Sequence, residues 1–439
     1  MRKLTVITCL FLVVGMTAFG QGFDHTKLDA YFDTLAKYDK FMGSVAISKN
    51  GEVIYTRSVG YLEVGSPGAA DENTKYRIGS ISKPFTATLI MKAVTENKLR
   101  LDQPIDGYFP TIENAEKITI SQLLSHRSGI ANFTSSPDYL VWHTQPKSEE
   151  ELVAIIAAGG SDFEPDTKAD YSNSNYVLLT YVLENVFEKP YAALLDEYIA
   201  QPVGLPNTFV GAAIEPANNE ARSYKAMNGW VAEPETDMSI PLGAGAVIST
   251  PTDIIRFGEA LLTGQIIPEE NVAQMKTIRD GYGMGLFQIP FHEKQAFGHS
   301  GGIDGFRSTW GYFPDERVSF ALTSNGAAMS TNDVAIAILS AVFNKPYDIP
   351  VFSNYQLKEG EVQQYVGVYA STQLPIKITI TNDGNTLLAQ ATGQPSFPLE
   401  ATAKDTFKFD QAGVVIEFDP GKDLLMLKQN GGEFTFIRE

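Results

Sequence analysis

Strand patterns stand at both ends of the longer part of this chain, and helical patterns fill the stretch between them. Residues 41–61 form two alternating apolar runs around Asn50-Gly51, the strongest short-range signal for a β-hairpin. Residues 297–325 alternate again, far along the chain. Because strands need partners, we expect the two ends to meet in one antiparallel sheet with helices on its faces. The fold class is therefore predicted to be α+β, with a helical lobe inserted between about residues 80 and 275.

The pattern changes beyond this domain, which is expected to span residues 21–345. Residues 346–357 contain two prolines and no amphipathic period, so they are predicted to form a linker. From residue 358 to 439, short alternating strands are separated by turn residues such as Asn382-Asp383-Gly384. This composition predicts a small all-β domain, either a barrel or a sandwich.

Residues 1–20 have the composition of a secretion signal. A basic start precedes an apolar run, and Ala18 and Gly20 supply small residues where a signal peptidase cuts. The run is shorter than the roughly 20 residues that a membrane span requires, which disfavours a permanent anchor. We expect export to the periplasm or the medium, without stable membrane insertion after cleavage. Because the only cysteine, Cys9, lies in this segment, the mature chain is expected to lack disulfides and thiol catalysis.

Charge and histidine spacing exclude several classes of partner. The formal net charge of -18 opposes phosphate backbones and anionic lipid, so nucleic acid is not an expected partner. His25, His143 and His292 are isolated and show no metal-ligand spacing, and His126 is interpreted as a structural residue at a helix-to-loop corner. Residues 281–285 lack the spacing of a nucleotide-binding glycine loop. No metal or other cofactor is predicted.

Ser80 and Lys83 form a Ser-x-x-Lys pattern at the start of a predicted helix. Residues at i and i+3 are neighbours on one helix face. The unpaired N–H groups at a helix start stabilise a developing anion, and a desolvated lysine there loses its proton near neutral pH and serves as a base. In the alternative, Ser80 caps the helix and Lys83 extends its amine to solvent.

Two further motifs follow in the chain. Tyr171 and Asn173 form the only Tyr-x-Asn, in which a phenol relays a proton and an amide binds an amide-like substrate. Alternatively, the tyrosine packs on the core and the asparagine caps a turn.

His299-Ser300-Gly301 is the only His-x-Gly and is predicted to lie at a sheet edge. Gly301 and Gly302 allow close approach of a substrate, and the Gly302 N–H is a candidate donor to an oxyanion. Alternatively, this stretch is a glycine-rich strand entry with a surface histidine.

The three motifs in this order resemble those of the penicillin-recognising serine hydrolases. The similar branch contains class C beta-lactamases, D,D-peptidases, D-aminopeptidases and esterases. The resemblance covers roughly residues 35–345 and extends to the stretches "YRIGSISKPFTA", "LLSHRSGI", "GAGAVISTPTDIIRF", "YGMGLF" and "HSGGIDGF". The C-terminal stretches "YVGVY" and "FTFIRE" resemble those of small lipocalin-like β domains that accompany such enzymes.

The resemblance implies a role for each motif residue. Ser80 is the expected nucleophile, Lys83 its activator and Tyr171 the residue that shares or relays the proton. Asn173 is expected to bind the substrate amide, and the N–H groups of Ser80 and Gly302 are expected to form the oxyanion hole.

His299, Ser300 and Gly301 are expected to line the substrate site. His299 stands where beta-lactamases carry the lysine of their Lys-Thr-Gly motif. This departure removes a fixed cation and argues against efficient beta-lactamase action.

The sequence thus predicts an exported serine hydrolase that acts on amide or ester substrates, possible fragments of peptidoglycan among them, through an acyl-enzyme on Ser80. The expected type is a D,D-peptidase or D-amino-acid peptidase. A carboxylesterase, a weak beta-lactamase and a non-hydrolytic receptor for penicillin or peptidoglycan remain alternatives.

Overall fold

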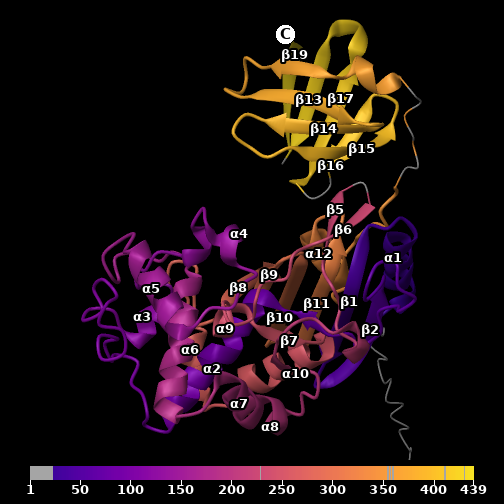
Figure 1. The fold of residues 1–439 in the computed structure, drawn as a ribbon. Helices are drawn as coiled ribbons and strands as arrows, with labels where there is room; N and C mark the ends of the chain where they lie inside the picture. The colour runs from indigo at the N-terminus through magenta and orange to yellow at the C-terminus, as the bar shows by residue number, and fades with distance from the viewer. Residues whose placement is uncertain are drawn as a thin grey trace, which may run out of the picture.

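The computed structural model describes residues 23–227, 229–352, 355, 357, 360–409, 412–429 and 431–439. The predicted signal segment lies outside the described residues, and so does part of the predicted linker. The described chain forms a larger domain of helices and sheet, and a β-barrel above it built from the C-terminal residues (Figure 1). The α+β class and the small all-β domain are confirmed.

The central sheet of the larger domain joins the two ends of the sequence, as predicted. It has six strands in the order β2-β1-β11-β10-β9-β8, and all neighbours are antiparallel. Asn50 and Gly51 have positive φ angles of 54° and 85°, as a tight hairpin between β1 and β2 requires. The strands are β1 (Phe41–Lys49), β2 (Glu52–Val59), β8 (Phe287–Phe291), β9 (Lys294–Ile303), β10 (Phe306–Phe313) and β11 (Val318–Ala327).

Helices cover both faces of this sheet. On one face, α1 (His25–Lys37) and α12 (Thr331–Val342) bury Leu28 and Ile338 in a common core. On the other face, α10 (Pro251–Leu262) packs against β10, where Phe257 contacts Trp310. The α12 helix is preceded by Ser330, whose side chain does not cap it.

The helical lobe is inserted between β2 and β8. Its long helices α2 (Ser82–Thr95) and α6 (Asn173–Phe187) pack together in the larger core, and α2 follows directly on the single turn η1 (Gly79–Ile81). The other elements of the lobe are β3 (Tyr76–Arg77), α3 (Ile120–Leu124), η2 (Phe133–Ser135), α4 (Tyr139–Trp142), α5 (Glu149–Gly159), α7 (Tyr191–Leu195), η3 (Asp196–Ala200), α8 (Gln201–Val203), β4 (Phe209–Val210), η4 (Pro216–Asn218), β5 (Tyr224–Met227), β6 (Gly229–Ala232), α9 (Leu242–Gly245), β7 (Val247–Ser249) and α11 (Glu269–Met275).

The C-terminal strands close into an eight-stranded barrel, so the expected barrel-or-sandwich choice resolves to a barrel. Its interior is filled by side chains that include the edge-on and tilted rings of Tyr365, Phe407 and Phe418. Its elements are η5 (Glu361–Gln364), β12 (Gly367–Ala370), β13 (Lys377–Asp383), β14 (Thr386–Ala391), β15 (Phe397–Ala403), β16 (Thr406–Phe409), β17 (Val414–Asp419), η7 (Pro420–Lys422), β18 (Leu424–Gln429) and β19 (Gly432–Arg438).

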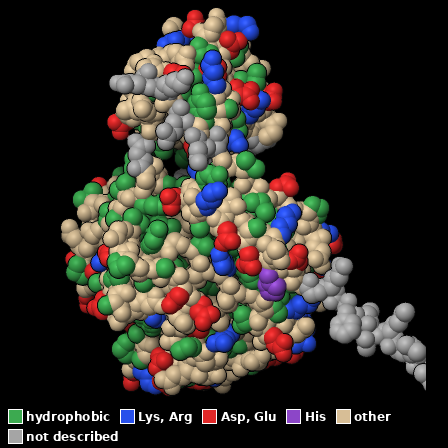
Figure 2. Space-filling view, turned by 90° about the vertical axis from the view of Figure 1, so that its right-hand side faces the viewer, with side chains coloured by type: hydrophobic (Ala, Val, Ile, Leu, Met, Phe, Trp, Pro, Cys, Tyr) green, Lys and Arg blue, Asp and Glu red, His purple; other side chains and the backbone are tan. Residues whose placement is uncertain are grey.

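The junction between the two domains is partly packed. Tyr347 and Phe352, both inside the predicted linker, pack against the core beneath α1 and α12. Lys40 of the larger domain pairs with Glu400 of the barrel. The face shown in Figure 2 carries acidic and basic side chains mixed over both domains. Within the residues that the structure describes, the helices all fall short of the length and apolar character that crossing a membrane requires.

Candidate active site

Ser80 lies in the turn η1, two residues before the first residue of helix α2. Gly79 has a φ of 52°, and the Ser82 hydroxyl fixes the turn by donating to the Gly79 carbonyl at 2.7 Å. The residue that precedes α2 is Ile81, which makes no side-chain cap. The Ser80 hydroxyl therefore does not cap the helix, and the alternative that gives Ser80 a capping role does not fit this geometry.

Strand β9 approaches η1 so closely that only glycine fits at one position. A Cβ atom on Gly301 would lie 2.1 Å from the Ile78 carbonyl oxygen and 3.0 Å from the Ser80 nitrogen. The neighbouring strand β8 pairs with β9 only as far as Gly298, which leaves the last part of β9 free on this side. The predicted sheet edge is therefore present only in the part of β9 that follows Gly298. This free part of β9 lies against η1, which brings Gly302 beside Ser80.

Lys83 is fully buried, with 0% of its surface exposed, so it does not extend to solvent. Its Nζ atom lies 3.0 Å from the Ser80 Oγ, 2.8 Å from the Asn173 Oδ1 and 2.8 Å from the Ala244 carbonyl oxygen. Burial lowers the pKa of Lys83 well below its usual value. A neutral amine donates two hydrogens, which Asn173 and Ala244 accept, and its lone pair then faces the hydroxyl of Ser80.

Tyr171 completes the group around the serine. Its hydroxyl lies close enough to Ser80 for that side chain to oppose the effect of burial on the pKa of Tyr171, and its ring centroid lies 4.8 Å from the Lys83 Nζ. Burial raises the pKa of Tyr171, so the phenol is neutral and holds a proton that it can donate. Its ring packs 4.4 Å from the ring of His126.

Asn173 begins helix α6 and uses both ends of its amide. The Oδ1 accepts from Lys83, and the Nδ2 donates to the Thr134 Oγ1 at 3.0 Å. The backbone N–H of Asn173 donates to the Asn132 side chain at 3.0 Å. Segment 132–134 of the lobe therefore fixes the position of the amide at the edge of the cavity.

His126 holds the loop that carries Tyr171. It has a φ of 57° just after helix α3 and is buried, and its Nδ1 accepts from the Ser172 N–H at 3.2 Å. Burial, with Lys83 and His299 nearby, lowers the pKa of His126 well below its usual value. The geometry agrees with a structural residue that positions Tyr171.

His299 lies behind the site and does not line the substrate cavity, which differs from expectation. Its ring packs 4.3 Å from Phe287 and 6.3 Å from Tyr171, and only 2% of the residue is exposed. Burial and the nearby Lys83 lower the pKa of His299 to about 3, so the ring is neutral at ordinary pH. Ser300 accepts from this ring through its carbonyl oxygen at 2.5 Å.

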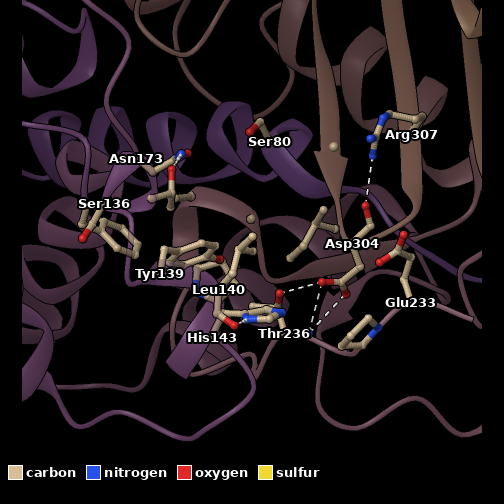
Figure 3. A pocket seen from close by; sticks show the side chains of 18 of the residues that line it. Ser80, Ser136, Tyr139, Leu140, His143, Asn173, Glu233, Thr236, Asp304 and Arg307 are labelled. Atoms are coloured by element: carbon tan, nitrogen blue, oxygen red, sulfur yellow. Dashed lines mark hydrogen bonds between the residues drawn. The ribbon is translucent and has the colours of Figure 1, made fainter. Parts of the chain in front are cut away.

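An open cavity of about 840 Å³ begins at Ser80. Figure 3 shows Asn173 and Tyr139 on one side of Ser80, with Asp304 and Arg307 on the other. Of the four predicted residues on β9, only Gly302 lines this cavity. Its full lining is Ser80, Phe133, Thr134, Ser136, Pro137, Tyr139, Leu140, His143, Asn173, Glu233, Pro234, Thr236, Pro241, Ala244, Gly245, Gly302, Ile303, Asp304 and Arg307.

Sequence reasoning missed two partners of the motif residues, Ala244 and Thr134. The carbonyl of Ala244 follows Gly243, where a Cβ atom would lie 2.4 Å from the Thr180 Oγ1 and 2.5 Å from the Thr86 Oγ1. The glycine-rich stretch "GAGAV" was a usable signal, because glycines mark close backbone approach. Thr134 gave no signal, since a single threonine in a loop is ordinary. In the described part of the chain, His, Cys, Asp and Glu side chains form no cluster of three that suits a metal ion.

A serine hydroxyl 3.0 Å from a buried amine whose pKa is lowered, beside two backbone N–H groups in an open cavity, is equipped to form and break an acyl bond. The fold and this site together define a serine hydrolase. Comparison with protein families agrees: residues 28–343 match the family described as Beta-lactamase, and the chain belongs to that family.

Individual relatives match most of the chain. Penicillin-binding protein 4* of Bacillus subtilis (strain 168) is 26% identical over 450 residues, covering 94% of this chain and 98% of that protein. The crystal structure of D-amino acid amidase from Ochrobactrum anthropi SV3 is 26% identical with a TM-score of 0.64, over 72% of this chain and 99% of that one. The octameric penicillin-binding protein homologue from Pyrococcus abyssi shares the fold, with a TM-score of 0.66 at 23% identity over 94% of this chain and 100% of that one.

Proposed function

We propose that this protein is an exported enzyme that hydrolyses amide or ester bonds of D-amino acid derivatives through an acyl-enzyme on Ser80. The observation that carries the proposal is the environment of Lys83. Its amine is fully buried, its pKa is lowered, and its Nζ lies 3.0 Å from the Ser80 Oγ. Export rests on the composition of residues 1–20.

Acylation starts with the transfer of the Ser80 proton to Lys83. The Ser80 oxygen attacks the substrate carbonyl and forms a tetrahedral intermediate. The negative charge that develops on the carbonyl oxygen is held by the N–H groups of Ser80 and Gly302. These donors belong to η1 and β9, which the close contact at Gly301 holds rigidly together.

The leaving group departs with a proton from Tyr171, which Lys83 then replaces. Tyr171 is suited to this step because its raised pKa keeps the phenol protonated. Water next attacks the acyl-enzyme, with the same residues acting in the reverse sense, and releases the acid. Asn173 orients the substrate amide at the cavity edge. The Asn173 side chain is itself held there by its hydrogen bond to Thr134.

Two observations favour D-amino acid amides and peptides over penicillins. The similar solved structures include that of a D-amino acid amidase. In addition, the neutral buried His299 supplies no fixed cation beside the serine. A carboxylesterase is the second candidate, because the same acyl-enzyme forms readily from esters.

Intact-mass spectrometry after exposure to D-phenylalanine amide, its L isomer, a p-nitrophenyl ester and benzylpenicillin tests the proposal. We expect turnover of the D-amide and the ester, slow acylation by penicillin and little reaction with the L-amide. The variant Ser80→Ala is the control and should form no adduct. A stable adduct with every reagent and no turnover would indicate a receptor instead of an enzyme.

A further inference from the structure

The proposed chemistry indicates which part of the substrate occupies the cavity. The leaving group has to lie beside the proton donor, Tyr171. Neither Tyr171 nor Lys83 lines the cavity of about 840 Å³, whereas Ser80 and Gly302 do. The acyl part of the substrate therefore occupies this cavity, and the residues at its far end contact the acyl chain.

Arg307 lines the same cavity, directly over Gly302. The two residues face each other in the β9–β10 ladder, and a Cβ atom on Gly302 would lie 3.5 Å from the Arg307 Nη1. The guanidinium donates to two main-chain carbonyls, those of Asp304 at 3.2 Å and Phe306 at 2.7 Å. Figure 3 shows it extended along this wall of the cavity. The cation is thus held in place next to the oxyanion donor.

Arg307 has no carboxylate partner among the residues that the structure describes, unlike other arginines nearby. Arg77 pairs with Asp304 and Glu235, and Arg222 pairs with Glu63 and Glu235. Because Asp304 forms its ion pair with Arg77, its carboxylate does not neutralise Arg307. The exposed guanidinium keeps free N–H donors, and their planar fork matches a carboxylate.

The catalytic cavity continues beyond Arg307. A second cavity of about 400 Å³ shares Glu233, Asp304 and Arg307 with the first. It also includes Lys225, which has no ion pair within the described chain, and the polar residues 330–332. An acyl chain that passes Ser80 thus reaches a polar space bordered by two basic side chains.

We propose that Arg307, assisted by Lys225, forms a subsite for a carboxylate on the distal end of the acyl group. The inference rests on the proposed function and adds a substrate class to it: acyl donors that end in an acid. A local cation matters here because the chain carries a net charge of -18, which otherwise repels anions. Glu233 borders the same space and opposes such a ligand, so its neutralisation should strengthen binding.

The test compares N-succinyl-D-phenylalanine p-nitroanilide with its N-succinamoyl counterpart, which is isosteric and lacks the charge. We expect the parent to favour the succinyl compound. Arg307→Gln should lower kcat/KM for it about tenfold, mainly through KM, and leave the neutral compound within about twofold. Arg307→Lys should retain part of the preference, and Glu233→Gln should increase it. Added salt should reduce it, since exposed charges are screened.

The matched control is Arg256→Gln, an exposed arginine on α10 that lines neither cavity. It should change neither substrate. An equal fall for both substrates in Arg307→Gln would show that Arg307 only holds the β9–β10 turn, and would overturn the proposal. Equal rates for both substrates in the parent would also overturn it.

Binding measurements separate this subsite from the proposed chemistry. Calorimetry of the two compounds with the Ser80→Ala variant needs no turnover. Tighter binding of the succinyl compound, lost in Ser80→Ala/Arg307→Gln, supports the subsite even if the parent fails to hydrolyse either anilide. Equal affinities of the two compounds for Ser80→Ala would reject the subsite and leave the Ser80 mechanism untouched.

Discussion

Burial governs the chemistry of Lys83 at the scale of single residues. The described residues place no carboxylate in an ion pair with its Nζ, and the contacts are a hydroxyl, an amide oxygen and a carbonyl oxygen. Hydrogen bonds to such neutral acceptors do not offset the free-energy cost of removing water from an ammonium group, so the proton binds weakly. The surroundings of Lys83 therefore lower its pKa and favour the neutral amine that a base requires.

A fluorophosphonate probe should label Ser80 alone. The reason is that no other serine of the catalytic cavity is bonded to a buried lysine. Peptide mapping by mass spectrometry gives the position of the adduct, and Ser80→Ala should remain unlabelled. An adduct on Ser136, the other serine in the lining, would contradict the assignment of the nucleophile.

Lys83→Met should lower ester turnover by about 10²-fold or more, since general-base assistance contributes about 10²–10⁴-fold. Methionine keeps most of the buried volume, and unchanged circular dichroism would show that the fold survives. Activity within a few-fold of the parent would exclude Lys83 as the base.

The pH profile of kcat/KM should fall on the acid side as Lys83 gains its proton. Burial lowers the pKa of Lys83, so the active neutral form persists to a pH well below the usual value for lysine and is lost as pH falls further. His299 has a pKa of about 3 and stays neutral throughout this range. His299→Gln should therefore keep the acid limb, and loss of that limb in this variant would assign the titration to the histidine.

At the scale of elements, the contact between β9 and η1 determines where the two oxyanion donors lie. The last part of β9 lies free of β8 and packs instead on the turn that carries Ser80. Ser308 of β10 strengthens the contact by donating to the Ile78 carbonyl at 2.7 Å. The sheet thus supports both oxyanion donors, and small displacements of η1 should impair acylation.

Gly301→Ala and Gly302→Ala form a matched pair that tests this contact. The added Cβ of Gly301→Ala meets the Ile78 oxygen at 2.1 Å, whereas that of Gly302→Ala meets only the flexible Arg307 side chain at 3.5 Å. We expect Gly301→Ala to slow acylation about 100-fold or more, because a misplaced oxyanion donor costs that much. Gly302→Ala should stay within about tenfold, as measured by burst kinetics with an ester. The opposite order would refute the role given to the contact.

The barrel and the catalytic domain have separate cores at the scale of the whole molecule. Tyr365 and Phe407 lie in the barrel core, whereas Tyr347 and Phe352 pack beneath α1 and α12. Between the domains lies a cavity of about 620 Å³, bordered by the tip of the β5–β6 hairpin and the barrel. The same hairpin leads into Glu233 and Thr236 of the catalytic cavity. The barrel therefore faces, across this cavity, the hairpin that leads into the substrate wall.

A chain that ends after Phe352 should fold and keep its reaction with a fluorophosphonate. The expected reason is that this end point preserves the packing of Tyr347 and Phe352 and removes only the barrel with its Lys40–Glu400 pair. Thermal unfolding and the labelling rate provide the measurements. Aggregation, or loss of labelling in a folded truncated chain, would show that the barrel completes the catalytic domain.

Local pattern in the sequence was enough to predict the sheet and the contact between Ser80 and Lys83. The Asn50-Gly51 hairpin depends on the backbone preferences of two adjacent residues, and the spacing of Ser80 and Lys83 depends on one helical turn. Alternation over residues 297–325 predicted strands for the same reason. Such signals lie within a few residues and require no knowledge of distant segments.

Only the tertiary structure decided how each motif residue is surrounded. The buried, neutral state of His299 depends on Phe287 and Tyr171, which come from other elements, so the ring lies behind the cavity that it was expected to line. The Ala244 carbonyl on Lys83 and the position of Arg307 over Gly302 likewise arise between segments far apart in the chain. Burial and hydrogen bonding are set by such long-range packing, and they determine the charge of an ionisable group.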